Sequence, residues 1–193
     1  MVSSASKPNG ARAPGRHQAP RHITSTKASS RAKRPNRPSV SQFAAIQKNL
    51  GPLLNGIVNY DFWVPEPTLS FPGVNEFLAK YRVAAAGKGV DPFGHYLPPF
   101  AYAYLQVLEQ SVNAVKSLDQ AKLADHMRKT TFDTVVGGVK FGRNGEWATS
   151  RVLMVQFRNV QKDNLEQFVE PGKRIVLYPK AWKSGEIAYP YKQ

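Results

Sequence analysis

The sequence predicts an α/β fold with a largely parallel sheet. Two observations carry this prediction. Apolar runs rich in β-branched and aromatic residues, which are typical of buried strands, occur at residues 53–64, 134–141, 151–160 and 174–178. Segments with helical periodicity separate the first two runs, as expected where helices connect neighbouring strands.

The strand candidates are bounded by residues that break regular structure. The run Leu53–Val64 stops at Pro65, with Pro67 close behind, so one buried strand should lead into an extended connection. The sequence Arg143-Asn144-Gly145 predicts a turn before the run at 151–160. The pair Gly137-Gly138 lies inside the second run, where glycine permits a bulge or a close approach of the backbone.

The spacing of apolar side chains predicts three helices. The first begins near Pro72, and the longest spans Pro98–Val115, with two prolines suited to its first turn. Ser117 has capping-box spacing with Gln120, which predicts a third helix over residues 118–129. The positions that share one face are Val74, Phe77, Leu78 and Tyr81 in the first helix, and Ala101, Leu105, Leu108, Val112 and Val115 in the longest.

The net charge of +14 is unevenly distributed along the chain. Residues 1–40 hold nine Lys and Arg and no acid, whereas the remainder holds 18 basic and 13 acidic groups. Residues 1–42 are expected to be a disordered Ser/Pro/Arg-rich tail, because they cannot bury enough apolar area to offset the entropy of ordering, and residues 43–193 to form the folded domain. Four interpretations of residues 1–40 stay open: an arm that binds nucleic acid or another anionic surface, an organellar transit peptide, a passive tail, or upstream sequence read from a displaced start.

Several function classes are excluded or disfavoured. The absence of cysteine excludes disulfides, thiolate zinc sites and cysteine nucleophiles. No apolar run is long enough to span a membrane, and Met1-Val2 is followed by polar residues rather than by the apolar core of a signal peptide. The four histidines (17, 22, 95 and 126) lack metal-ligand spacing, and no nucleophile motif is present. We therefore expect no enzyme activity, no cofactor and no metal.

Six segments, in this order, resemble the C-terminal portion of the type I periplasmic solute-binding proteins of ABC importers, in the branched-chain-amino-acid (leucine-binding-protein-like) branch. They are Asn55–Pro67, Phe71–Tyr81, Tyr96–Val112, Phe132–Trp147, Arg151–Val160 and Val176–Tyr191. The resemblance implies an incomplete type I periplasmic-binding-protein fold, with partial Rossmann-like lobes, behind a disordered N-terminal tail. It also implies crossovers between the lobes near Trp63–Pro67 and Ala148–Arg151.

The same resemblance implies a function and a location. A solute, such as an amino acid, is held in the cleft between the lobes, and closure of the lobes creates the surface that ABC permease subunits recognise. The location implied is the periplasm, although without a recognisable signal peptide the chain could stay in the cytoplasm. Because the N-terminal portion of the family is absent, the apolar faces of the two longer helices need another partner or remain exposed.

The predicted function is that of a non-catalytic solute-binding component, or a fragment of one. The alternatives are a basic-tailed nucleic-acid-associated protein and a truncated gene product without independent activity. The candidate ligand-binding residues are Trp63, Tyr60 and Tyr102, whose rings suit an apolar solute, and Glu66, whose carboxylate suits an ammonium group. Pro65 and Pro67 are the candidate hinge. The competing interpretation places the aromatic side chains in the core and Glu66 in an exposed loop.

Overall fold

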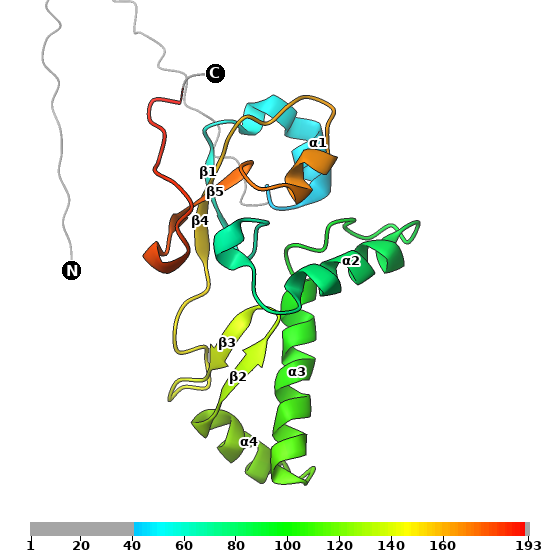
Figure 1. The fold of residues 1–193 in the computed structure, drawn as a ribbon, viewed down its shortest axis with the longest axis vertical. Coiled ribbons are helices and arrows are strands. Elements are labelled where there is room, and N and C mark those ends of the chain that lie inside the picture. Colours follow the sequence, from blue (N-terminus) through cyan, green and yellow to red (C-terminus); the bar gives the residue numbers. More distant parts are fainter. Residues whose placement is uncertain (1–40, 192–193) are drawn as a thin grey trace, which may run out of the picture. The chain divides into compact units, whose positions relative to one another are not determined.

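In the computed structural model, which describes residues 41–191, three strands form one antiparallel sheet (Figure 1). The strands are β1 (Val58–Asp61), β4 (Leu153–Phe157) and β5 (Arg174–Tyr178), in the order β1-β4-β5. Both pairs are antiparallel, so the prediction of a largely parallel sheet is wrong for these strands. Parallel pairing needs a long crossover between neighbouring strands, whereas β4 and β5 are joined without an intervening α-helix.

The second predicted strand is instead a hairpin. Its strands are β2 (Thr131–Thr134) and β3 (Gly137–Lys140), and they pair antiparallel around a turn at residues 135–136. The Thr134 hydroxyl group stabilises the turn, because it accepts from Val136 N at 3.2 Å and donates to Gly137 O at 2.7 Å. The sequence missed this turn because its two central residues are buried valines rather than the usual glycine, asparagine or aspartate.

Gly137 shows the close backbone approach that the sequence predicts for the glycine pair. Its φ of +86° is in the left-handed region, and a Cβ atom there would lie 2.9 Å from Cε1 of Phe71. Glycine is therefore required for both conformation and space. Downstream, the predicted turn at residues 143–145 is confirmed, because Gly145 N donates to Gly142 O at 3.0 Å. Beyond this turn, Trp147 forms a β-bridge with Phe141.

Four α-helices complete the described chain. They are α1 (Ala44–Leu50), α2 (Val74–Ala85), α3 (Pro98–Val115) and α4 (Gln120–Lys129). The predicted bounds of α3 are confirmed at both ends, and helix α2 begins close to Pro72 as expected. Helix α4 begins later than predicted, because Asp119 rather than Ser117 caps it, with Oδ1 accepting from Lys122 N at 2.9 Å.

Helix α3 packs against α4 and the hairpin (Figure 1), but not through the apolar stripe seen in the sequence. The face that contacts the core contains Pro99, Ala103, Val107 and Ser111. Leu105 and Leu108 of the apolar stripe are 57% and 37% exposed. The stripe is thus largely exposed at Ala101, Leu105 and Leu108 and half-buried at Val112 and Val115, so exposure, one of the two outcomes expected from the sequence, holds for its first part.

Two apolar clusters hold these elements together. The larger one joins the strands β4 and β5 to α2, α3 and the hairpin, through buried side chains such as Leu153, Val176 and Phe132. The smaller one, which includes Leu54, Phe157 and Phe168, packs α1 against the other end of the sheet. The connections between β1 and α2 and between β3 and β4 therefore run next to the larger cluster, where they can shape a site.

Candidate functional site

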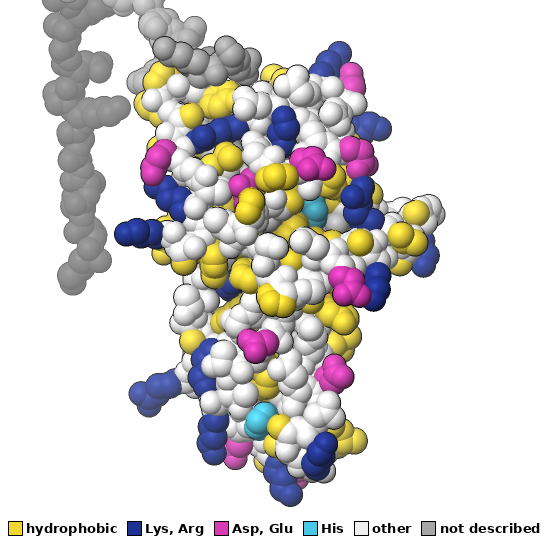
Figure 2. All heavy atoms as spheres, in the orientation of Figure 1, with side chains coloured by type: hydrophobic (Ala, Val, Ile, Leu, Met, Phe, Trp, Pro, Cys, Tyr) yellow, Lys and Arg dark blue, Asp and Glu magenta, His cyan; other side chains and the backbone are white. Residues whose placement is uncertain are grey.

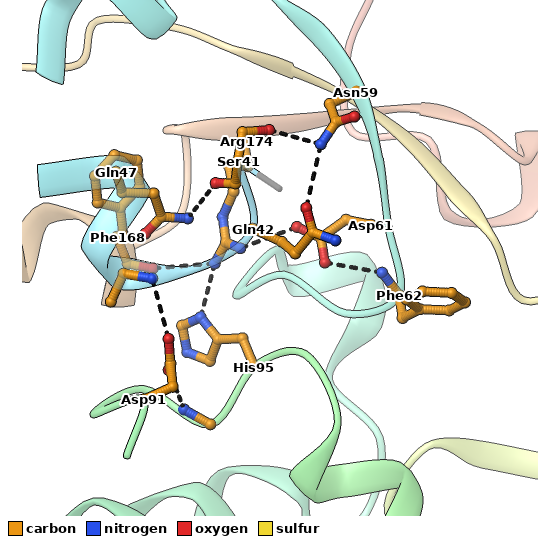
Figure 3. Close-up of polar contacts among 12 residues, drawn as sticks. Ser41, Gln42, Gln47, Asn59, Asp61, Phe62, Asp91, His95, Phe168 and Arg174 are labelled. Carbon is orange, nitrogen blue, oxygen red and sulfur yellow. Dashed lines mark hydrogen bonds and ion pairs between the residues drawn. The ribbon is translucent and has the colours of Figure 1, made fainter. Parts of the chain in front are cut away.

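The largest fully buried side chain among the described residues is that of Arg174 (Figure 3). Its Nη1 donates to Asp61 Oδ2 at 3.0 Å, and both side chains are 1% exposed. Its Nη2 donates to His95 Nδ1 at 2.7 Å and to Phe168 O at 3.3 Å. These partners come from β1, the loop before α3 and the short 3₁₀ helix Glu166–Val169, so one side chain connects three other segments to β5, two of them distant in the sequence.

The contact with Arg174 fixes the protonation state of His95. An arginine side chain only donates hydrogen bonds, so Nδ1 of His95 must accept and the imidazole carries its proton on Nε2. Burial lowers the pKa of His95 well below its usual value, and the neighbouring charges of Arg174 and Arg82 lower this pKa further. The imidazole is therefore neutral at pH 7 and acts as a structural acceptor.

The aromatic candidates from the sequence occupy three different environments. Trp63 is buried, and its Nε1 donates to Leu69 O at 3.1 Å. Tyr60 is half-buried against the edge of Phe62, with ring centroids 5.9 Å apart. Tyr102 is 43% exposed on α3, where it stacks on Phe77 at 4.8 Å. The structure does not bring these three side chains together around one cavity of the described chain.

Glu66 lies between the two candidate hinge prolines and is buried rather than exposed. Its Oε1 accepts from Gly172 N at 2.7 Å, which fastens the connection after β1 to the loop before β5. Pro65 is half-buried, and Pro67 begins the 3₁₀ helix Pro67–Leu69. The ligand-binding role of Glu66 and the hinge role of the prolines stay predictions.

A cavity of about 840 Å³ lies where the connections leave the sheet. The segment 71–72 before α2, the β2–β3 hairpin, α3 and the connection between β3 and β4 all contribute to its walls. Its polar and charged lining residues are Gln106, Asp133, Thr134, Thr149 and Arg151, and its aromatic ones are Phe71 and Trp182. An opening of this size can hold a small solute.

Arg151 is the unusual residue of this cavity. It is 7% exposed, and its Cζ lies 4.0 Å, 4.7 Å and 5.2 Å from the ring centroids of Trp182, Phe71 and Trp147. Within residues 41–191, its Nε and Nη2 are buried without a hydrogen-bond partner. Burial lowers the pKa of Arg151 to about 10, so the group still carries its charge at pH 7.

Sequence reasoning singled out neither Arg151 nor Arg174. Both begin segments that the sequence identified as strands, but their roles depend on partners from other segments of the chain. Arg151 meets rings from positions 71, 147 and 182, and no local pattern joins these positions. The signal available was a charged residue at the start of a buried apolar run, which predicts either a partner or an unusual environment.

A second, apolar cavity of about 290 Å³ lies between α3, α4 and the hairpin. Among the described residues, no group of His, Asp or Glu side chains is arranged to hold a metal ion. No helix within the same range is both long and apolar enough to cross a membrane. The 840 Å³ cavity, with its charged lining, is therefore the candidate functional site.

The family model described as periplasmic binding protein matches residues 38–163. The chain belongs to the periplasmic binding protein family. Among solved structures, this family member is similar to the leucine-binding protein LivK of Thermotoga maritima, with 23% sequence identity and a TM-score of 0.45. The match covers 60% of this chain and 31% of LivK, so the periplasmic binding protein described here spans about a third of the length of LivK. No curated protein matches the chain.

Substitution of the two buried arginines of this periplasmic binding protein should have opposite effects on stability. Arg174→Met leaves Asp61 buried without a counter-ion and should lower the free energy of unfolding by about 3–5 kcal/mol. Arg151→Met removes two unpartnered donors, at about 1–3 kcal/mol each, and loses cation–π contacts of about 0.5–2 kcal/mol. It should therefore raise that free energy by about 1 kcal/mol. Urea denaturation checks both values.

The control for this pair is Arg128→Met, which removes an exposed ion pair with Asp125 on α4. Its effect should stay within about 0.5 kcal/mol. If Arg174→Met cost no more than this control, the buried ion pair would not stabilise the sheet.

The neutral state of His95 should make stability fall at acidic pH. Because the folded-state pKa is lower than the unfolded-state value of about 6.5, the unfolded chain binds the proton first as the pH decreases. The free energy of unfolding should fall by up to about 1.4 kcal/mol per pH unit below pH 6.5. His95→Gln keeps an acceptor for Arg174 without titrating, so its stability should fall less between pH 7.5 and pH 5. Equal slopes in urea denaturation of both proteins would contradict this account.

Proposed function

We propose that this chain is the solute-binding component of an ABC importer, or a fragment of that component, and that it binds a small solute such as an amino acid without chemical conversion. The observation that carries the proposal is the cavity of about 840 Å³, which lies next to the connection between β3 and β4 in a chain of the periplasmic binding protein family. Members of this family work in the periplasm, and the proposed partners are a solute and the subunits of a membrane permease.

The lining of the cavity supports the binding of a small solute. Aromatic rings pack against the guanidinium group of Arg151. The Thr134 hydroxyl group forms hydrogen bonds within the turn of the hairpin. Gln106 Oε1 accepts from Val135 N at 2.9 Å, which places its amide group at the wall of the cavity. These polar side chains, set among the aromatic rings of Phe71 and Trp182, offer hydrogen bonds and apolar contacts to a small solute.

Solute binding should raise the thermal stability of the full chain. A ligand at about 100 times its Kd adds roughly 2.7 kcal/mol to the free energy of unfolding, which shifts the melting temperature measurably. The experiment is a thermal-shift screen of the common amino acids, followed by calorimetry on those that stabilise the protein. A chain without independent activity would show no shift with any solute, and that result would reject the proposal.

Two variants of the β2–β3 hairpin, one that fills the cavity and one that does not, serve as a matched pair in this screen. Gly138 lines the cavity on β3, and a Cβ atom there would lie 3.7 Å from its nearest neighbour, Cγ2 of Thr131. Gly138→Leu should therefore be tolerated and should abolish the shift, because its side chain occupies the solute volume. Thr131→Leu changes an exposed position of the same hairpin outside the cavity lining and should retain the shift.

The second candidate function is non-specific nucleic-acid binding through residues 1–40, which lie outside the described residues. The observation that favours it is the concentration of nine Lys and Arg in this segment. In the described part of the chain, basic and acidic side chains are interspersed on the face shown in Figure 2, so no single-sign patch competes with the segment there.

If residues 1–40 bind nucleic acid, deleting them should abolish retention of the protein on a DNA or RNA column. Retention of the full chain should also weaken as salt rises, because basic side chains that neutralise phosphates release counter-ions. Equal retention of the full and shortened chains at 50 mM and 200 mM salt would reject this function. The solute-induced thermal shift is the independent control that the shortened chain remains folded.

A further inference from the structure

We infer that the apolar cavity of about 290 Å³ is a second binding site, which takes a small neutral aromatic molecule. This site is separate from the proposed solute site, because the two cavities share no lining residue among those described. The β2–β3 hairpin lies between them. Val139 of β3 lines the apolar cavity and its neighbour Gly138 lines the larger one, as expected where successive residues of a strand face opposite sides.

The floor of the apolar cavity is formed where α3 presents a small side chain to the hairpin. The hairpin and α4 both pack against α3 (Figure 1). Ala103 and Val107 lie four residues apart on one face of α3, and Val136 and Val139 of the hairpin line the same cavity. All four side chains are buried. Because Ala103 fills little of the space between the helix and the hairpin, a recess remains.

The cavity is accessible from solvent along α3. Tyr104 and Leu108 line it and are 70% and 37% exposed, so these two residues form its mouth. The half-buried residues that line the cavity between mouth and floor are Phe100, Met127, Phe141 and Trp147. A ligand can therefore enter past exposed side chains without displacing a buried one.

The lining determines the class of ligand. None of the described residues that line the cavity is charged, so a charged ligand would lose water without gaining a partner. The rings of Phe100, Phe141 and Trp147 can make edge contacts with another aromatic ring, and the sulfur atom of Met127 is a further favourable neighbour for one. Because an apolar cavity of about 150 Å³ holds benzene, this larger volume admits a fused pair of rings such as indole.

The test follows the methionine methyl groups by NMR. The full chain, isotope-labelled at these groups, is titrated with indole. The Met127 signal should shift, because a bound aromatic ring changes the magnetic environment of a methyl group beside it, whereas the signal of Met154 on β4, outside the lining, should not. Purine has the same fused-ring shape but more ring nitrogen atoms, which would be buried without partners. It should therefore bind about 10- to 100-fold more weakly than indole.

Two pairs of substitutions on α3 assign the binding to this cavity. Ala103→Leu fills the floor and should weaken indole binding about 10- to 100-fold, whereas Ala101→Leu makes the same change at an exposed position outside the lining and should not. Leu108→Glu places a charge at the mouth and should also weaken binding, with Leu105→Glu as its exposed control. The second pair changes exposed positions, so it tests the site even if Ala103→Leu does not fold.

The possible results either support or overturn the site. A Met127 shift that saturates with indole, and that Leu108→Glu weakens while Leu105→Glu does not, supports it. The site is overturned if indole leaves the Met127 signal unchanged, if purine binds as tightly, or if the variants and their controls bind equally well. A Met127 signal that instead changes with protein concentration, together with a dimer in sedimentation, would mean that a second copy covers the mouth, which also overturns the site. Failure of the amino-acid screen would reject the proposed function and leave this site standing.

Discussion

Arg174 on β5 and Asp61 at the end of β1 form a buried ion pair between the two outer strands of the antiparallel sheet. Removing both charges from water costs free energy. The hydrogen bonds that the guanidinium group donates to His95 and to Phe168 O help to offset this cost. Those contacts fix the loop before α3 and the 3₁₀ helix before β5. The three strands are short, so they form few hydrogen bonds with one another. The contacts of Arg174 therefore help to specify how these strands are arranged.

Arg174 and Arg151 are both buried, but the chain treats their charges differently. Both guanidinium groups are removed from water, but only the first has its charge neutralised by the chain. The first therefore joins the outer strands of the sheet, whereas the second carries two buried donors without a partner among the described residues, which costs folding free energy.

Local signals in the sequence predicted local structure well. Two prolines and a long apolar periodicity gave the bounds of α3, and a β-branched run gave those of β5. Pairing was not predictable in this way, because Asn59 on β1 faces Val155 on β4 from a distant part of the chain. The surroundings of Arg151 were not predictable for the same reason, since the rings around it come from three separate segments. Family membership was accessible because it depends on many short segments in order rather than on any one contact.

The close approach between Gly137 and Phe71 limits which substitutions the chain can accept at both positions. A side chain at position 137 would collide with the Phe71 ring, and that ring is also one of the three that surround Arg151. Positions 71, 137 and 151 therefore cannot vary independently, although they lie on three different parts of the chain. Among natural variants of this protein, a smaller residue at position 71 would leave room for a side chain at position 137. The left-handed backbone would still favour glycine or asparagine at position 137.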